Sequence, residues 1–307
     1  MTNEVQNFLL TDAIQNIIHS SRTGAKKLSK NRIASYGSFK KIIEGYEIHL
    51  QKSIYVQNIN LDFLNKFSTY LEEEKKYSNG YSLKKIADLK TICLNAEQKG
   101  FKIDTELKTY KALKEKKQHI IYLTSEELEM IKIFPLFDSE LENARKWLLL
   151  GCEIGQRSVD LLKINESSLT SKNGIEVIEL TQEKTGKQIA IPIRPSLRLI
   201  LYDGFPTKKP LHKLNEQIKK ICKLCGINQK IEGVLYDFES KRRTEGVFEK
   251  HRLITAHVCR RTFAINNYGK MQSRLLRQIT GHSTETILLE FIGKKETPQA
   301  SQTLSLF

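Results

Sequence analysis

A lysine-rich segment in the first half of the chain is the feature that most restricts how this sequence can fold. Residues 108–122, "KTYKALKEKKQHIIY", contain many lysines and few residues suited to a core. Charged lysine side chains are rarely buried, so this stretch is expected to lie at the surface between two separately packed regions. The chain of 307 residues is therefore predicted to form two domains, joined by a linker over residues 113–122.

The region before the linker has the apolar periodicity of helices. Phe39, Ile42, Ile43 and Tyr46 recur at helical intervals, and later runs repeat the pattern. We expect an all-helical domain over residues 33–112, preceded by an N-terminal segment or arm over residues 1–32. The start of that segment has the pattern of a short amphipathic helix rather than of a signal peptide, and residues 20–34 are expected to form a linker or an extended arm.

The region after the linker begins with a helix-capping pattern. Thr124 followed by Glu127 is typical of a capping box, which places the start of the second domain near residue 123. β-Branched alternation on both sides of "KTGK" predicts a hairpin that turns at Thr185-Gly186. Helical periods then return from Pro195 to the end of the chain. The fold class is thus predicted as mainly α with a small antiparallel β-sheet, with domains over 33–112 and 123–295 and a tail over 296–307.

The charge of the chain favours a polyanionic partner. The formal net charge is +15, whereas hydrophobic residues make up 39%, enough to build cores. Nucleic acid is the first candidate partner, and the alternative is evenly spread lysines with no specific partner. No apolar run approaches the ~18–20 residues that span a bilayer.

The cysteines indicate a reducing compartment. Five cysteines at irregular spacing fit free thiols in a cytoplasmic protein better than a disulfide framework. Cys222 and Cys225 form a lone CxxC, which we interpret as core residues near a helix end that is capped by Gly226, not as a zinc site.

Four separated stretches contain residues suited to phosphate chemistry. They are "GCEIGQRSVDLLKI" with Arg157, "TQEKTGKQIAIP" with Lys184, "TAHVCRRTFAINNYG" with His257 and Arg260, and "GHSTETILLEFIGK" with His282. Each stretch alone is more often structural: a hairpin lysine is usually solvated, and His-x-x-Arg on one helix face is common by chance. Their significance lies in their order.

In order and context the four stretches resemble the tyrosine recombinases, the phage-integrase family, over residues 123–295. The stretches "CRRTFA" and "EFIGK" are similar to the corresponding stretches in integrases of Bacteroidetes-type mobile elements. The resemblance implies a helical core-binding domain and a mixed α/β catalytic domain that form a C-shaped clamp on double-stranded DNA. It also implies self-association into dimers or tetramers on DNA, docking of the 296–307 tail on a neighbouring protomer, and chemistry that needs no metal and no other cofactor.

The resemblance also assigns roles to individual residues. Arg157 and Arg260 would hold the non-bridging phosphate oxygens, and Lys184 would protonate the leaving oxygen. His257 would assist proton transfer, and His282 would donate a hydrogen bond to the phosphate. Further contacts to the DNA are expected from a basic set: Lys84, Lys85, Lys90, Lys114, Lys116, Lys117 and Arg261.

Phe291 stands where this family has its nucleophilic tyrosine, nine residues after His282. A phenylalanine ring has no oxygen to attack phosphorus, so the chain is expected to bind DNA without cleaving it. Three explanations are open: replacement of a tyrosine to trap an uncleaved complex, a natural inactive paralogue, or an accidental resemblance with Phe291 as a core residue. We favour the first, because a decaying site would also have lost other members.

Two other functions are alternatives to a site-specific recombinase that integrates or transposes a mobile element. One is a DNA-binding regulator or architectural protein without catalysis, against which the four-part pattern argues. The other is an enzyme related to type IB topoisomerases, which relaxes DNA instead of exchanging strands.

Overall fold

The computed structural model describes residues 7–24, 27–111, 119–237, 239–240 and 242–294. The chain divides into two compact units, an N-terminal unit over Met1–Lys117 and a C-terminal unit over Gln118–Phe307. Most of the linker that was expected over 113–122, with Lys114, Lys116 and Lys117, lies outside the described residues, as does the tail over 296–307. Among the described residues, every helix is too short or too polar to cross a bilayer.

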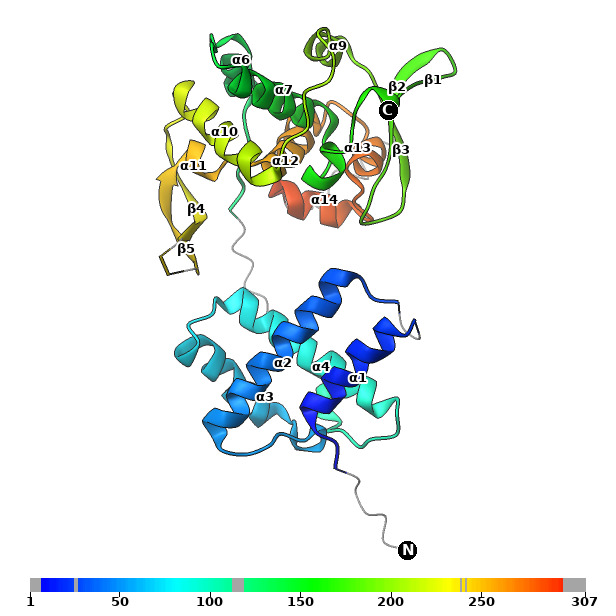
Figure 1. Ribbon diagram of the computed structural model, residues 1–307, viewed down its shortest axis with the longest axis vertical. Helices are drawn as coiled ribbons and strands as arrows, with labels where there is room; N and C mark the ends of the chain where they lie inside the picture. Colours follow the sequence, from blue (N-terminus) through cyan, green and yellow to red (C-terminus); the bar gives the residue numbers. More distant parts are fainter. Residues whose placement is uncertain (1–6, 25–26, 112–118, 238, 241, 295–307) are drawn as a thin grey trace, which may run out of the picture. The chain divides into compact units, whose positions relative to one another are not determined.

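The N-terminal unit is all-helical (Figure 1). Its elements are α1 (Leu10–Arg22), α2 (Lys30–Leu50), η1 (Val56–Asn58), α3 (Leu61–Thr69), the π-helical η2 (Tyr70–Glu74), α4 (Asn79–Glu97) and α5 (Glu106–Thr109). Ser29 caps α2 by accepting from the backbone N–H of Arg32, and Asn60 caps α3 in the same way through Phe63. Phe39, Phe67 and Leu89 lie in the core that these helices share.

Helix α1 is the amphipathic helix that was expected at the start of the chain, but it belongs to the helical domain and not to a separate N-terminal segment or arm over residues 1–32. Its apolar face, with Leu10, Ile14 and Ile17, is at most 2% exposed and belongs to the core of the N-terminal unit. The backbone N–H of Leu10 donates to the carbonyl of Ile54 at 2.9 Å. An amphipathic helix is stable only when its apolar face finds a partner, and residues far along the chain supply it here. Helix α2 also begins at Lys30, which shortens the linker that was expected over residues 20–34.

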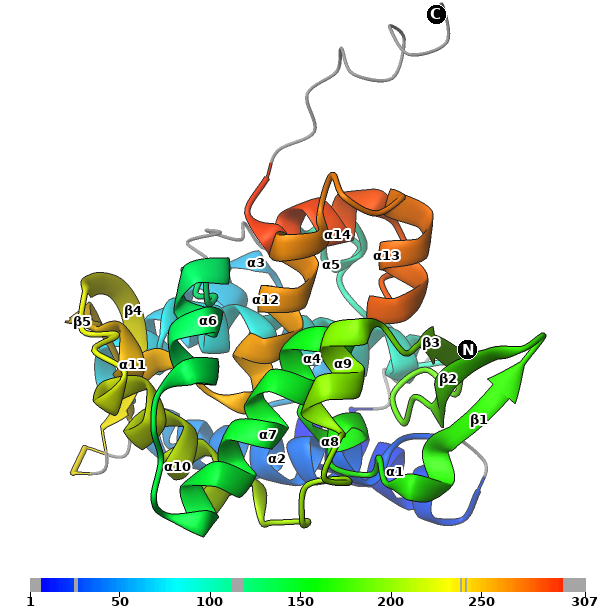
Figure 2. The same cartoon turned by 90° about the horizontal axis from the view of Figure 1, so that it is seen from above.

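The described part of the C-terminal unit is a helical assembly with two antiparallel sheets. Its helices are α6 (Ser125–Ile133), α7 (Ser139–Ile154), α8 (Ser158–Leu161), η3 (Glu166–Ser168), α9 (Pro195–Ile200), α10 (Leu211–Leu224), α11 (Lys250–Leu253), α12 (Ala256–Asn267), α13 (Ser273–Thr280) and α14 (Glu285–Ile292). Its strands are β1 (Leu169–Lys172), β2 (Ile175–Thr181), β3 (Gln188–Pro192), β4 (Lys230–Asp237) and β5 (Arg242–Glu249). Figures 1 and 2 show the two sheets on opposite sides of the helices. The predicted fold class, mainly α with a small antiparallel β-sheet, is confirmed, and the described residues form a second small sheet in addition.

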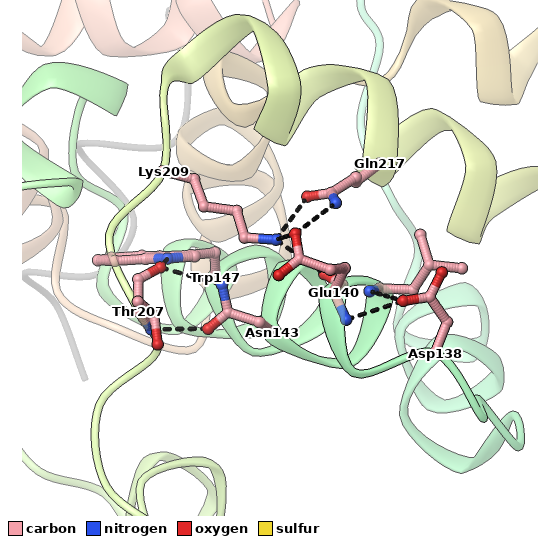
Figure 3. Close-up of polar contacts among 8 residues, drawn as sticks. Asp138, Glu140, Asn143, Trp147, Thr207, Lys209 and Gln217 are labelled. Carbon is pink, nitrogen blue, oxygen red and sulfur yellow. Dashed lines mark hydrogen bonds and ion pairs between the residues drawn. The ribbon is translucent and has the colours of Figure 1, made fainter.

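Helix α7 is central to the C-terminal unit and packs against α10 and α12. Trp147 is buried on α7, and its indole N–H donates to the carbonyl of Thr207 at 2.9 Å. Asn143 makes two further hydrogen bonds to the backbone of Thr207, and Lys209 pairs with Glu140 (Figure 3). These contacts fix the loop before α10 onto α7, so that α7 is anchored at the end remote from the site described below.

Two local predictions about this unit agree with the structure. The Thr124–Glu127 capping box forms as expected, and Glu127 also makes a buried ion pair with Lys250 of α11 at 2.6 Å. Cys222 and Cys225 are buried in the core at the end of α10, where Gly226 follows with φ +73°.

The β4–β5 hairpin corrects the prediction that only helices follow Pro195. Strand β4 pairs with β5 from Lys230↔Glu249 to Asp237↔Arg242. Most side chains of both strands are half-buried or exposed, so the sequence lacks the apolar alternation by which a strand is recognised. Gly233 lies opposite Gly246, and a Cβ on Gly233 would come within 2.6 Å of Leu253 on α11. The hairpin is therefore placed by a close approach to α11.

Candidate active site

Arg157 is positioned by the sharp end of α7. Gly155 ends this helix with φ +65°, and a Cβ there would lie 2.3 Å from the ring of Phe263 on α12. Glycine is thus required both by the backbone conformation and by the contact. The turn places Arg157 at the N-cap of α8, half-buried, with a buried Nη1 that has no hydrogen-bond acceptor among the described residues. A buried donor without an acceptor is unusual and is suited to an anionic ligand.

Arg260 is on α12, and it lies beside Arg157. Its side chain is only 2% exposed, and Nη1 donates to the carbonyl of Gly155 at 3.3 Å. Burial and the positive charge of Arg157 lower the pKa of Arg260 to about 9, whereas Asp160 raises it. Two guanidinium groups that are close enough to repel each other favour a negative charge beside them.

The rings of His282 and Phe291 lie against each other close to Arg260. Their ring centroids are 4.8 Å apart, and the guanidinium carbon of Arg260 is 6.0 Å from the centroid of Phe291. Burial, followed by the charges of Arg260 and Arg157, lowers the pKa of His282 to about 4. The ring of Phe291 is half-buried and packs against the core of the unit, so it is both a core residue and a neighbour of these side chains.

His257 precedes Arg260 by one turn of α12 and remains exposed. Loss of water on the side that faces the protein lowers its pKa, and the charges of Arg261, Arg260 and Arg157 lower it further. The structure thus brings together five of the six side chains that the sequence singled out: Arg157, His257, Arg260, His282 and Phe291.

Lys184 is the sixth, and the structure does not bring it into described contact with the others. It is exposed on the turn between β2 and β3. The residues beside it are nevertheless fixed to the site. The backbone N–H of Glu183 donates to Asp160 at 2.8 Å, and Asp160 is 1% exposed. The base of the hairpin is therefore anchored next to Arg157, and the lysine extends from it into solvent.

Two buried glutamine side chains hold the separated segments together, and the sequence analysis missed both. Gln182 donates to the side-chain oxygen of Gln156 at 3.0 Å and to the carbonyl of Ile279 at 3.2 Å. Gln156 also donates to Ile279, at 2.9 Å. These amides join the Arg157 turn, the Lys184 hairpin and the end of α13 just before His282. Their positions, one or two residues from predicted site residues, were the available signal. Neutral amides were passed over in favour of charged groups.

Thr280 orients the imidazole of His282 and was missed for the same reason. Its hydroxyl donates to the carbonyl of Leu276 at 2.5 Å and lies 2.9 Å from Nδ1 of His282. Since a hydroxyl has a single proton, its oxygen accepts from Nδ1–H. Nε2 then carries a proton only when the ring is charged, and only in that form does it donate to a phosphate.

Three of the expected DNA contacts already have partners within the protein. Lys85 was predicted at the DNA surface, but it is 2% exposed and lies 3.5 Å from Asp88 on its own helix. This correction has a tertiary cause, since Arg32 of α2 also binds Asp88, at 2.6 Å. Lys90 donates to the backbone carbonyls of residues 108 and 110, both at 2.8 Å.

Arg261 is the third of these. Its guanidinium carbon is 4.8 Å from the ring centroid of Phe291, and Nη1 donates to the carbonyl of His119 at 3.2 Å. Lys84 remains exposed on α4.

The lowered pKa of His282 predicts a pH dependence of stability. Unfolded histidine titrates near its ordinary pKa of 6.5, whereas the folded value is about 4. The unfolded chain therefore binds more protons between these values, and folding stability falls as the pH drops through this window. Between about pH 7 and pH 5 we expect His282 to account for a loss of about 1 kcal/mol in the free energy of unfolding, after allowance for solvent screening.

Urea unfolding at the two pH values measures this loss. His282→Gln serves as the control, since it keeps a polar side chain without a titrating group, and its stability should fall less on acidification. An equal decline in both proteins would contradict the assignment.

The comparisons with known proteins concern the N-terminal domain and the fold of the chain. Residues 9–116 match the phage integrase SAM-like domain. No curated protein sequence matches the chain.

Solved structures extend the likeness to both units. One is a lambda integrase dimer bound to a COC′ core site, with a TM-score of 0.62, 16% identity, and coverage of 94% of this chain and 98% of that one. The Tn1549 transposon integrase in complex with a circular intermediate DNA gives a TM-score of 0.67 at 13% identity, covering 97% and 98%. The XerH site-specific recombinase bound to difH gives 0.61 at 15% identity, covering 97% and 84%. The N-terminal unit thus carries a phage integrase SAM-like domain, and the chain as a whole has the fold of the tyrosine recombinases.

Proposed function

We propose that this protein is a site-specific DNA recombinase of the tyrosine type whose nucleophile position is occupied by Phe291, so that it binds DNA but does not cleave it. The observation that carries the proposal is the convergence of Arg157, Arg260 and His282 beside the ring of Phe291. These residues come from the end of α7, from α12 and from the segment after α13, and nothing in their local structure requires them to meet.

The geometry suits the binding of one backbone phosphate. Burial and the positive charge of Arg157 lower the pKa of Arg260, and a bound anion would relieve this repulsion between the two charges. We infer that their guanidinium groups hold the non-bridging oxygens, where charge accumulates when phosphorus is attacked. His282 would donate through Nε2 once the phosphate has raised its pKa, with Thr280 fixing the ring.

Proton transfer is assigned to the two exposed members of the set. His257 has a lowered pKa, so that it is neutral near pH 7 and able to take a proton from an attacking hydroxyl. Lys184 extends from the β2–β3 turn and would protonate the leaving 5′ oxygen. With a tyrosine in place of Phe291, attack would give a 3′-phosphotyrosyl link that conserves the bond for religation.

The wider setting follows from the same proposal. We place the chain in the cytoplasm as the integrase or transposase of a mobile element that forms dimers or tetramers on DNA. Closure of the two units around the duplex stays a prediction, as does docking of the 296–307 tail on a neighbour.

Recovery of bound DNA tests the proposal. The protein is expected to co-purify with DNA fragments that share a sequence, and its affinity should fall steeply with salt because several phosphates are neutralised. Fragments without a shared sequence would favour an architectural protein instead. On Phe291→Tyr protein, relaxation of supercoils without exchange between two sites would favour a topoisomerase. Failure of the protein to bind DNA at all would contradict every version.

A further inference from the structure

A groove of about 630 Å³ lies between β3 and α13, next to the candidate active site. His282 and Gly281 are among its lining residues. Lys187, just before β3, and Arg274 and Arg277, on α13, also line it. The groove therefore continues from the proposed phosphate position along the surface of the C-terminal unit.

The charge of this groove is uncompensated. No carboxylate is among its lining residues, and Lys187, Arg274 and Arg277 form no ion pair within the described part of the chain. Two other cations around the same sheet are neutralised, in the pairs Lys172–Glu179 at 2.6 Å and Arg198–Glu176 at 2.5 Å. Solvated surface cations commonly stand near carboxylates, so three unpaired cations along one groove point to an anionic occupant.

Arg277 is held in place where the groove meets His282. Its Nη2 donates to the carbonyl of Ser283 at 3.3 Å, and its carbonyl accepts from the backbone N–H of His282 at 3.0 Å. Its Nε is buried and has no acceptor among the described residues. The guanidinium is thus fixed on the same turn that places His282, with a donor still to be satisfied.

We propose that this groove binds the sugar–phosphate backbone of the DNA strand immediately beyond the phosphate held at His282. The inference rests on the proposed function, which supplies the phosphate at that end. One strand carries a phosphate for every ~3.4 Å of helix axis, so a groove that is lined by His282 lies within reach of the phosphates next to the one held there. Guanidinium and ammonium groups contact such phosphates without reading sequence, which sets the register of the strand on the protein.

The salt dependence of DNA affinity tests the groove. Binding of the full chain to a short duplex of mixed sequence is measured by fluorescence anisotropy between about 50 and 200 mM salt, for which log K falls linearly with log salt concentration. Lys187→Ala and Arg274→Ala should each lower the magnitude of the slope by about 1. Both residues are exposed, so neither variant depends on the fold-supporting contacts of Arg277. Arg277→Ala should behave in the same way.

Arg198→Ala is the matched control, because it removes the same charge from the other side of the sheet, where Glu176 already pairs with it. Its slope should equal that of the native chain. If Lys187→Ala and Arg274→Ala bind DNA as tightly as the native chain and with the same slope, the groove proposal is overturned. The proposed function then still stands. If the slope is unchanged in these variants but their sedimentation coefficient differs from that of the native chain, the groove contacts an acidic protein segment. That result would also overturn the groove proposal. A native chain that does not bind DNA would overturn both proposals.

Discussion

Phe291→Tyr is expected to yield a covalent protein–DNA adduct where the native chain yields none. The change adds one hydroxyl to a ring that already lies 4.8 Å from the imidazole of His282 and 6.0 Å from the guanidinium carbon of Arg260. Phe291 is half-buried, with its neighbours in place, so the substitution should not disturb packing. The positioned phosphate, the two arginines and the proton-transfer groups would then act on a nucleophile at close range.

The measurement uses a nicked suicide duplex built from the sequence recovered with the native protein. Loss of the short fragment beyond the cleavage point traps the adduct, which appears as a band of reduced mobility in a denaturing gel. Phe291→Leu controls for changes in packing at this position and should remain unreactive. A tyrosine-restored protein that binds its recovered site tightly and forms no adduct would show that Phe291 does not occupy a nucleophile position.

Arg260→Met is expected to make the folded chain more stable while destroying its phosphate chemistry. Arg260 is 2% exposed, and its pKa is lowered to about 9 by burial and by Arg157. Within the described part of the chain its side chain makes one long hydrogen bond, to the carbonyl of Gly155. A buried charge of this kind costs free energy that a methionine of similar length avoids. We expect the free energy of unfolding to rise by about 1–2 kcal/mol.

The same substitution in Phe291→Tyr protein should slow adduct formation by about 10²–10³, the loss typical of removing one donor to a developing charge. Urea unfolding and adduct kinetics provide the two readouts. Arg145→Met is the matched control for stability, because Arg145 pairs with Glu142 and also donates to two backbone carbonyls. That variant should be destabilised. A loss of stability in Arg260→Met would show that its guanidinium is a structural element, not a strained binding group.

Much of the candidate site could be predicted because its chemistry requires particular side chains. Arginine, lysine and histidine in a fixed order are visible in a sequence whatever the fold around them. The residues that hold these side chains together could not be identified from the sequence. Gln156 and Gln182 carry no charge, and their hydrogen bonds to Ile279 join residues more than ninety positions apart. Thr280 is an ordinary helix residue until its distance to His282 is known.

The elements that were mispredicted share a dependence on distant partners. Helix α1 was expected as an amphipathic helix outside the helical domain, because its partners in that domain, such as Ile54, lie beyond α2 in the sequence. Lys85 was expected at the DNA surface because the sequence does not show that Arg32 and the ring of Phe39 enclose it with Asp88. Strands β4 and β5 lack a buried face of their own, so only their pairing and their approach to α11 reveal them.

The sequence by itself determined the local features: the Thr124–Glu127 cap, the glycine that ends α7 at residue 155, and the set of cationic side chains. Each depends on backbone geometry or charge within a few residues. The tertiary structure alone decided which cations face one another and which make ion pairs or hydrogen bonds within the protein. Proximity between segments depends on packing and buried hydrogen bonds across the whole unit, and these set both the pKa of His282 and the burial of Arg260.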